Sequence, residues 1–468
     1  MHAADISVYR KQRYGFRVAK TDLDAESTSR APRTTARLAW LIGPALVAGV
    51  AYLDPGNVAS NMTAGARYGY LLVWVVVLGN VMAWLIQYLS AKLGIVTGKS
   101  LPETLGERIT HRWSRRAYWV QAELVAMATD IAEVIGGAVA LNLLFGVPLL
   151  WGGVITGTVS IVLLIVQSRR GPRTFEFIVI GLVAIIAIGF TFGVFIAPPD
   201  AGSVVEGMVP RFEDTGSVLL AASILGATIM PHAIYAHSAL ARDRFAPIAA
   251  GRPEMFQTLT ETAPESTAAR NTRANGELEQ QRGISTVRLL RATKWDVSIA
   301  MLIAGTVNLC ILLLAAANLA GVEGTDTLEG AYEALSAGIG PMVATLFAVG
   351  LLASGLASTS VGAYAGAEIM HGLLHIRIPL IARRLITLIP ALIILGIGVD
   401  PTLALVLSQV VLSFGIPFAL IPLVVLTAQQ RTLGEFRNRV LTTAAGVVAS
   451  VFLIALNGVL LWLVLTGS

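Results

Sequence analysis

Cysteine and charge are both scarce in this sequence of 468 residues. The single cysteine, Cys310, allows no intramolecular disulfide and matches no metal or redox motif. Only 13% of the residues are charged, whereas a soluble domain carries roughly 25%. Hydrophobic residues make up 55%, and the mean hydropathy is +0.71. This composition excludes an ordinary soluble protein and predicts an all-α integral membrane protein.

The N-terminal residues lack an apolar run. Residues 1–36 are polar and charged, unlike a secretory signal peptide. Further along, apolar runs reach the length of about 20 residues that crosses a bilayer. We predict 11 membrane-spanning helices, of which the third carries charges. They lie near 38–61, 70–95, 117–145, 149–167, 175–197, 217–241, 296–321, 339–366, 380–399, 402–427 and 440–466.

Positive charge is nearly missing from one set of connections between these spans. On one side we find only Arg67 and Arg211, among acidic residues, whereas the N-terminal tail and the other connections are rich in Lys and Arg. Cytoplasmic loops carry this excess. We therefore expect a multi-pass protein of the cell membrane with a cytoplasmic N-terminus and an extracellular C-terminus. The net charge of +5 is spread over short loops, so the partner is the lipid bilayer and not a nucleic acid.

One connection, 242–294, is long and polar and has no apolar periodicity, so we expect a flexible cytoplasmic loop. Residues 1–37 then form a cytoplasmic tail, 38–197 hold five spans, 217–427 hold five more, and 440–466 form an eleventh. Because each set has an odd number of spans, the two sets have opposite orientations. This arrangement predicts the inverted repeats of secondary transporters.

The first span of each set is interrupted by polar residues. Residues 54–57 read Asp-Pro-Gly-Asn, and residues 230–232 read Met-Pro-His. Proline disrupts the helical hydrogen bond to residue i−4, and an Asp at the membrane centre costs roughly 2.5–3.5 kcal/mol. Interrupted backbone at this depth is tolerated where it lines a cavity. A matching pair of breaks therefore predicts the binding site of a transporter.

The groups at these breaks suit a cation. Asp54 offers a carboxylate, Asn57 an amide oxygen, and Ala227 the carbonyl that loses its partner to Pro231. Met230 adds a thioether, which favours softer metals and gives nothing to Mg(II) or Ca(II). The mixed set predicts Mn(II) or Fe(II), with Cd(II) as a toxic mimic. Two alternatives remain: Met230 as a gap-filling side chain, and Asn57 as a helix cap.

The third span carries carboxylates along one helix face. Asp130 and Glu133 are three residues apart, and Glu123 lies two turns earlier. Such a stripe inside a membrane predicts a proton relay; the alternative is a structural ion-pair network with arginines of facing helices. Since His titrates near neutral pH, His232 is a candidate proton acceptor or gate. His237 fits a structural or pathway-lining role better.

Four segments together resemble the Nramp family of proton-coupled divalent-metal transporters: residues 54–57, 126–133, 230–232 and 407–415. The resemblance covers about residues 38–465. It implies the leucine-transporter-type fold, with ten helices in two inverted repeats and an eleventh helix. It also implies import of Mn(II) and Fe(II) coupled to protons, with Cd(II) and Co(II) as further substrates.

The resemblance also implies residue roles. It places metal ligation on Asp54, Asn57, the Ala227 carbonyl and the Met230 sulfur, with Gln409 joining in some conformations. It places proton handling on Asp54, Asp130, Glu133 and His232, with a charged network of Glu123, Arg244, Arg383 and Arg384. We expect gating or pathway-lining roles for Pro55, Gly56, Pro231 and His237. Residues 366–372 read Gly-Ala-Glu-Ile-Met-His-Gly and depart from the family pattern, which has a Gln after the first Gly.

Other functions fit the sequence less well. We find no nucleophile–base pair and no HExxH motif, so we expect neither an enzyme nor a cofactor. A channel would not need the carboxylate stripe. The second candidate is a cation-coupled amino-acid symporter of the same fold, which needs free helix N-termini for a carboxylate; Met230 argues against it. We expect the monomer to be functional, although the sequence does not give the oligomeric state.

Overall fold

The computed structural model describes residues 43–170, 172–245, 276–376 and 379–466. The chain divides into two units, Met1–Arg37 and Leu38–Ser468, and all described residues belong to the second. Within these ranges the regular secondary structure is entirely helical. This confirms the predicted all-α class.

The first half of the described chain contains the first interrupted helix and the carboxylate-bearing helix. Its elements are α1 (Pro44–Gly49), η2 (Val50–Leu53), α2 (Pro55–Tyr68), α3 (Val73–Thr97), α4 (Leu101–Arg108), α5 (Arg112–Phe145), α6 (Leu149–Arg170), α7 (Pro172–Ile196) and α8 (Ala201–Glu206).

The second half contains the second interrupted helix. Its elements are α9 (Thr215–Ile229), α10 (Pro231–Arg244), α12 (Thr286–Asn318), α13 (Leu328–Gly338), α14 (Pro341–Leu374), α15 (Leu380–Gly396), α16 (Pro401–Ala428), α17 (Gln430–Leu433), η4 (Gly434–Phe436) and α18 (Val440–Thr466).

Eight helices in the described ranges are long and apolar enough to cross a membrane, with α9 and α10 taken as one. Pro44–Leu53 and Ile180–Ile196 are shorter apolar helices. Each range predicted as a span overlaps a helix. Length and composition thus support a multi-pass membrane protein, while the count of 11 spans stays a prediction.

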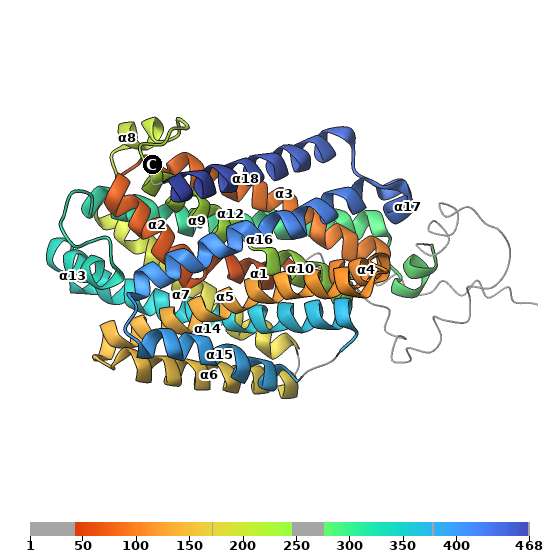
Figure 1. Cartoon of the computed structure of the whole chain (residues 1–468), viewed down its shortest axis with the longest axis horizontal. Helices are drawn as coiled ribbons and strands as arrows, with labels where there is room; N and C mark the ends of the chain where they lie inside the picture. The colour runs from red at the N-terminus through yellow and green to blue at the C-terminus, as the bar shows by residue number, and fades with distance from the viewer. Residues whose placement is uncertain (1–42, 171, 246–275, 377–378, 467–468) are drawn as a thin grey trace, which may run out of the picture. The chain divides into compact units, whose positions relative to one another are not determined.

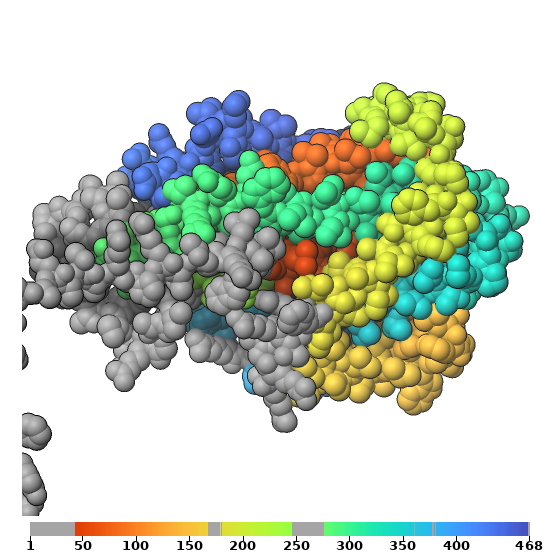
Figure 2. Space-filling model, turned by 180° about the vertical axis from the view of Figure 1, so that it is seen from behind, coloured from red at the N-terminus to blue at the C-terminus, as the bar shows by residue number. Residues whose placement is uncertain are grey.

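The interrupted helices lie in the interior. The long helices run between one end that carries α8 and α13 and another that carries α4 and α17 (Figure 1). The α2 helix packs against α9, α12 and α16, and α1 packs against α10 and α12. From the other side, α12 runs along the surface, and a small red part of the first interrupted helix shows beside it (Figure 2). The breaks are therefore enclosed by other helices.

The connection predicted as a loop over 242–294 differs from the structure at both of its ends. The α10 helix continues to Arg244, residues 276–282 are helical, and α12 begins at Thr286. The start of α12 is basic and polar, so it gives no apolar signal although it is helical. Residues 246–275 lie outside the described ranges.

Candidate functional site

Both breaks are junctions between consecutive helices. Asp54 separates η2 from α2 in an extended conformation (φ −73°, ψ 165°), and Met230 separates α9 from α10. Pro55 and Pro231 are each the first residue of the following helix, where the missing N–H has no intrahelical partner to lose. The prolines therefore begin the second half of each interrupted helix, as the predicted discontinuous helices require.

Asp54 is fully buried and caps α2. Its Oδ1 accepts a hydrogen bond from the backbone N–H of Asn57 at 2.7 Å, while Gln409 Nε2 lies 3.4 Å from its Oδ2. The alternative role of Asn57 as the helix cap is wrong, because Asp54 holds that position. One carboxylate oxygen thus orders the break, and the other faces α16 with a single weak donor.

Asn57 connects the two breaks. Its Nδ2 donates to the carbonyl oxygens of Tyr52 at 2.9 Å and Ala227 at 2.8 Å. Asn308 on α12 also donates to Tyr52, and Ser354 on α14 donates to the Leu53 carbonyl. Side chains therefore satisfy the carbonyls that the break releases, which is how interrupted backbone is tolerated inside a membrane. The Ala227 carbonyl, predicted to lose its helical partner, accepts a hydrogen bond from Asn57 instead.

Two buried amide oxygens at this junction lack a donor in the part of the chain that the structure describes. Neither Asn57 Oδ1 nor Gln409 Oε1 has a hydrogen-bond partner among the described residues. The Gln409 amide nitrogen is engaged with Asp54 and with Ser408 Oγ. A buried acceptor without a partner costs free energy, and a cation satisfies such oxygens without any donor. The junction therefore has the chemistry of a cation site.

The remaining predicted ligand, Met230, is buried at the second junction. The α16 helix passes both breaks closely, because a Cβ added at Gly56 or Gly226 would overlap Gln409. The described residues contain no group of three or more His, Cys, Asp or Glu side chains that could hold a metal. A metal at this junction would thus depend on neutral donors beside the single carboxylate of Asp54.

Two arginines of α15 cover the carboxylate stripe of α5. Arg384 Nη1 lies 2.7 Å from Asp130 Oδ1 and 3.2 Å from Glu133 Oε2. Arg383 Nη2 lies 2.9 Å from Glu123 Oε1, and its Nη1 lies 3.9 Å from Asp130 Oδ2. The ion-pair network that the sequence left as an alternative is present. Each of the three carboxylates also keeps one buried oxygen that accepts no hydrogen bond within the described ranges.

The stripe approaches both breaks. A Cβ on Gly136, one turn after Glu133, would overlap the Pro55 ring. His232 Nδ1 lies 3.1 Å from Thr129 Oγ1, the residue before Asp130. His237 faces another way, with its Nδ1 2.7 Å from Gln87 Oε1 on α3. Of the two histidines, His232, which we predicted to handle protons, therefore lies beside α5, and His237 does not.

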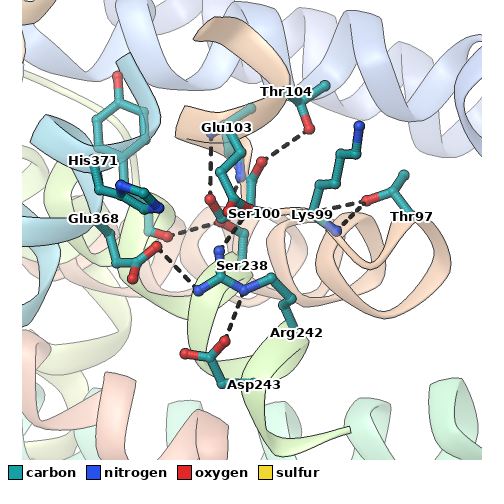
Figure 3. Close-up of polar contacts among 12 residues, drawn as sticks. Thr97, Lys99, Ser100, Glu103, Thr104, Ser238, Arg242, Asp243, Glu368 and His371 are labelled. Atoms are coloured by element: carbon teal, nitrogen blue, oxygen red, sulfur yellow. Dashed lines mark hydrogen bonds and ion pairs between the residues drawn. The ribbon is translucent and has the colours of Figure 1, made fainter. Parts of the chain in front are cut away.

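Sequence reasoning missed an ion cluster at the α4 end of the helices (Figure 3). Arg242 at the end of α10 contacts Glu103 of α4 at 2.6 Å, Asp243 at 2.7 Å and Glu368 of α14 at 3.2 Å. Tyr364 donates to Asp243 at 2.7 Å. We refer to these five residues as the Arg242 cluster. It joins the second half of an interrupted helix to two other helices, whereas the predicted network named the nearby Arg244.

Glu103 is fixed by its own helix. It forms a capping box with Ser100, with Glu103 Oε2 2.6 Å from the Ser100 backbone nitrogen. Burial alone would raise the pKa of Glu103, but the backbone hydrogen bond at Ser100 and the charge of Arg242 outweigh it and hold the pKa below its ordinary value. Glu103 therefore presents a negative charge to Arg242. A Ser-x-x-Glu signal marks this cap in the sequence.

With this geometry in place, comparison with known proteins is informative. The family model described as natural resistance-associated macrophage protein-like (Nramp) matches residues 45–463. The chain belongs to the Nramp family. The match spans both breaks, the carboxylate stripe and all of α16, so it confirms the resemblance seen in the sequence.

Relatives of known function match over most of the chain. A divalent metal cation transporter MntH of Mycobacterium tuberculosis is 54% identical over 436 residues, which cover 93% of this chain and 94% of that protein. The MntH of Bacillus subtilis is 45% identical and covers 89% of this chain and 90% of its own length. These relatives are transporters, in agreement with the prediction that this Nramp protein is not an enzyme.

Solved structures support the fold. A crystal structure of an Eremococcus coleocola manganese transporter has a TM-score of 0.73 at 31% identity, covering 90% of this chain and 85% of that one. The structure of MhsT with L-phenylalanine has a TM-score of 0.53 at 13% identity, covering 90% and 99%. The second likeness concerns the fold alone. Together they confirm the predicted leucine-transporter-type fold.

Proposed function

We propose that this Nramp protein imports divalent transition metals, Mn(II) and Fe(II), together with protons by alternating access. The observation that carries the proposal is the junction of the two interrupted helices. There a buried carboxylate and two amide oxygens without donors meet a carbonyl and a methionine. The names of the relatives, divalent metal cation transporters and a manganese transporter, support the same substrate class. Cd(II) and Co(II) fit the same donor set.

In this proposal the metal is held by Asp54, Asn57, the Ala227 carbonyl and the Met230 sulfur, with Gln409 joining from α16. The oxygens supply hard donors, and the thioether favours transition metals over Mg(II) and Ca(II). For the Ala227 carbonyl to bind a cation, the Asn57 amide has to release it. If the Asn57 amide turns over, its Oδ1 takes the position that Nδ2 now occupies. Both the Ala227 carbonyl and Asn57 Oδ1 could then face the same cation.

Protons would leave the site along α5. Binding of a dication to Asp54 displaces a proton from its carboxylate. On α5, Asp130 and Glu133 each offer a carboxylate oxygen that accepts no hydrogen bond within the described ranges. His232, beside Thr129, connects the second break to this path. Arg383 and Arg384 keep the carboxylates paired, while Arg244 lies where α10 ends. Each positive charge that enters gains about 2.3 kcal/mol per 100 mV of inside-negative potential.

We propose further that residues 38–197 and 217–427 form inverted repeats, with the N-terminus in the cytoplasm, the C-terminus outside and the protein in the cell membrane. The matched places of the two breaks, each in the first span of its set, support the repeats. The distribution of Lys and Arg supports the orientation.

A cation-coupled amino-acid symporter remains the second candidate. Its substrate carboxylate would need backbone N–H groups at the start of a broken helix. At the start of α2, Asp54 already accepts from the N–H of Asn57, which disfavours this candidate.

The deciding experiment is uptake into proteoliposomes at two external pH values, with internal pH recorded. We expect Mn(II) to enter faster at the lower external pH and the lumen to acidify as it enters. Mn(II) entry without acidification would contradict proton coupling. Uptake of labelled alanine without Mn(II) uptake would favour the symporter.

A further inference from the structure

A groove at the α8 end shares no lining residue with the junction of the two breaks. It has a volume of about 590 Å³ and lies between α3, α18 and the residues that follow α8. These three elements lie close together in Figure 1. The walls are almost entirely apolar and include Trp74, Val77, Val81, Phe212 and Phe452, and Arg211 also lines the groove.

The groove follows the direction of a membrane helix. Trp74 lies in the first turn of α3, and Val81 lies seven residues further along. This separation corresponds to about 10 Å at 1.5 Å per residue, compared with about 15 Å for one half of the hydrocarbon core. Phe452 lies near the middle of α18. The groove therefore extends from the end of α3 into the depth occupied by acyl chains.

Two of the residues that line this groove carry polar groups, Trp74 and Arg211. Trp74 is only 7% exposed, and its indole Nε1 has no hydrogen-bond partner in the described part of the chain. The ring contacts Phe212 and Phe452 edge to face, at centroid distances of 5.4 and 6.5 Å. A buried N–H without an acceptor costs free energy. Arg211, half exposed, pairs with Glu206 at 3.0 Å and leaves other guanidinium donors for an anion.

We propose that this groove binds one glycerophospholipid from the membrane leaflet at the α8 end. An acyl chain lies along Val77, Val81 and Phe452, an ester carbonyl accepts from Trp74 Nε1–H, and the phosphodiester pairs with Arg211. Arginine suits this role because its planar fork matches phosphate geometry. A peptide is a poorer occupant, since the apolar walls would leave its backbone groups unsatisfied. The proposal goes beyond metal transport and does not depend on it.

Native mass spectrometry of the full-length protein in detergent tests this site, with phosphatidylglycerol and phosphatidylethanolamine as probes. We expect one retained lipid per chain for both probes, because they share the phosphodiester and the esters. Arg211→Ala should lower retention about tenfold, as loss of a charge-assisted hydrogen bond does. Trp74→Phe removes only the indole N–H and should lower retention about threefold. Val77→Trp fills the groove and should abolish retention.

Matched controls exist for both polar residues. Arg67→Ala removes an arginine that pairs with Asp326 outside the groove, and Trp462→Phe alters an exposed tryptophan of α18; neither should change retention. Soluble glycerol phosphate should not compete, because it lacks the acyl chain.

Two results would overturn the proposal. The first is equal retention in Arg211→Ala, Trp74→Phe and the unaltered protein; a loss in Val77→Trp alone would then mean a hydrocarbon slot without headgroup recognition. The second is an equal loss in the two controls. Unfolding temperatures of all variants identify any that fail to fold. If Val77→Trp does not fold, Arg211→Ala and Trp74→Phe still test the proposal.

Discussion

The amide of Asn57 donates to the carbonyl oxygen of Ala227 at 2.8 Å, across 170 positions of sequence. This bond ties the broken end of one helix to that of the other. The same amide holds the Tyr52 carbonyl. A cation that takes the Ala227 carbonyl therefore competes with a hydrogen bond within the protein. At the proposed metal site, substrate binding would therefore be coupled to the link between the two interrupted helices.

Asp54→Ala should abolish Mn(II) uptake, with at least about a hundredfold loss, because it removes the only carboxylate that the described residues contribute to the proposed ligand set. It also removes the cap of α2, which is worth about 0.5–2 kcal/mol. Asp54→Asn is the matched variant, because it can cap the helix without the charge. We expect it to keep an unfolding temperature near that of the unaltered protein and to lack uptake in proteoliposomes. Uptake by either variant would refute the proposed site.

Met230→Ala should weaken the preference for Mn(II) and Cd(II) over Mg(II) and Ca(II), because a soft donor is lost while the oxygens remain. Competition assays in proteoliposomes measure this preference. Met62→Ala, which removes another buried methionine of an interrupted helix, controls for lost packing. If both variants keep the original selectivity, the thioether has no role in choosing the ion.

Arg384→Ala should lower the free energy of unfolding by about 3–5 kcal/mol, because it leaves the buried Glu133 without its cation and Asp130 with only the more distant Arg383. Thermal unfolding in detergent detects such a loss. Adding Glu133→Gln to Arg384→Ala should restore part of it by removing one uncompensated charge. If Arg384→Ala does not change the unfolding temperature, the ion pairs of Arg384 with Asp130 and Glu133 do not stabilise the fold.

The Arg242 cluster should make stability depend on pH. Because the pKa of Glu103 is lowered on folding, its contribution is present above the ordinary value of 4.5 and is lost as the pH falls through the lower folded value. Glu103→Gln should therefore unfold at a lower temperature at pH 7, and this difference should shrink in acid. Glu107 lies on the same helix as Glu103 and forms an exposed pair with Lys99. Glu107→Gln should therefore have little effect on the unfolding temperature. A difference that is constant with pH would contradict this assignment.

Local patterns in the sequence predicted much of the local geometry around the candidate site. Prolines mark both breaks, and the three-residue spacing of Asp130 and Glu133 placed them on one face, because these signals act within a helical turn or two. The bond between Asn57 and Ala227 has no such signal, since it joins segments 170 residues apart. The Arg242 cluster likewise gathers α4, α10 and α14, and only the cap at Ser100 was readable in advance.

The boundaries of helices were predicted less well where they leave the apolar layer. The α12 helix begins at Thr286, ten residues before the predicted span, because its first turns are basic and hydropathy detects only apolar runs. Ser285 is its N-cap residue, and that capping signal could have located the start. Span prediction thus finds the part of a helix that lies in lipid and misses the part that extends beyond it.

The glycines beside Gln409 restrict how this protein could evolve. A methyl group at Gly226 would overlap a backbone oxygen of α16, which cannot step aside as a flexible side chain can. A bulkier residue there would push α9 and α16 apart. If the proposed site is right, a new ion preference would therefore arise through exchange of donor atoms at Asp54 or Met230, because the spacing of α9 and α16 at Gly226 leaves no room for gradual change.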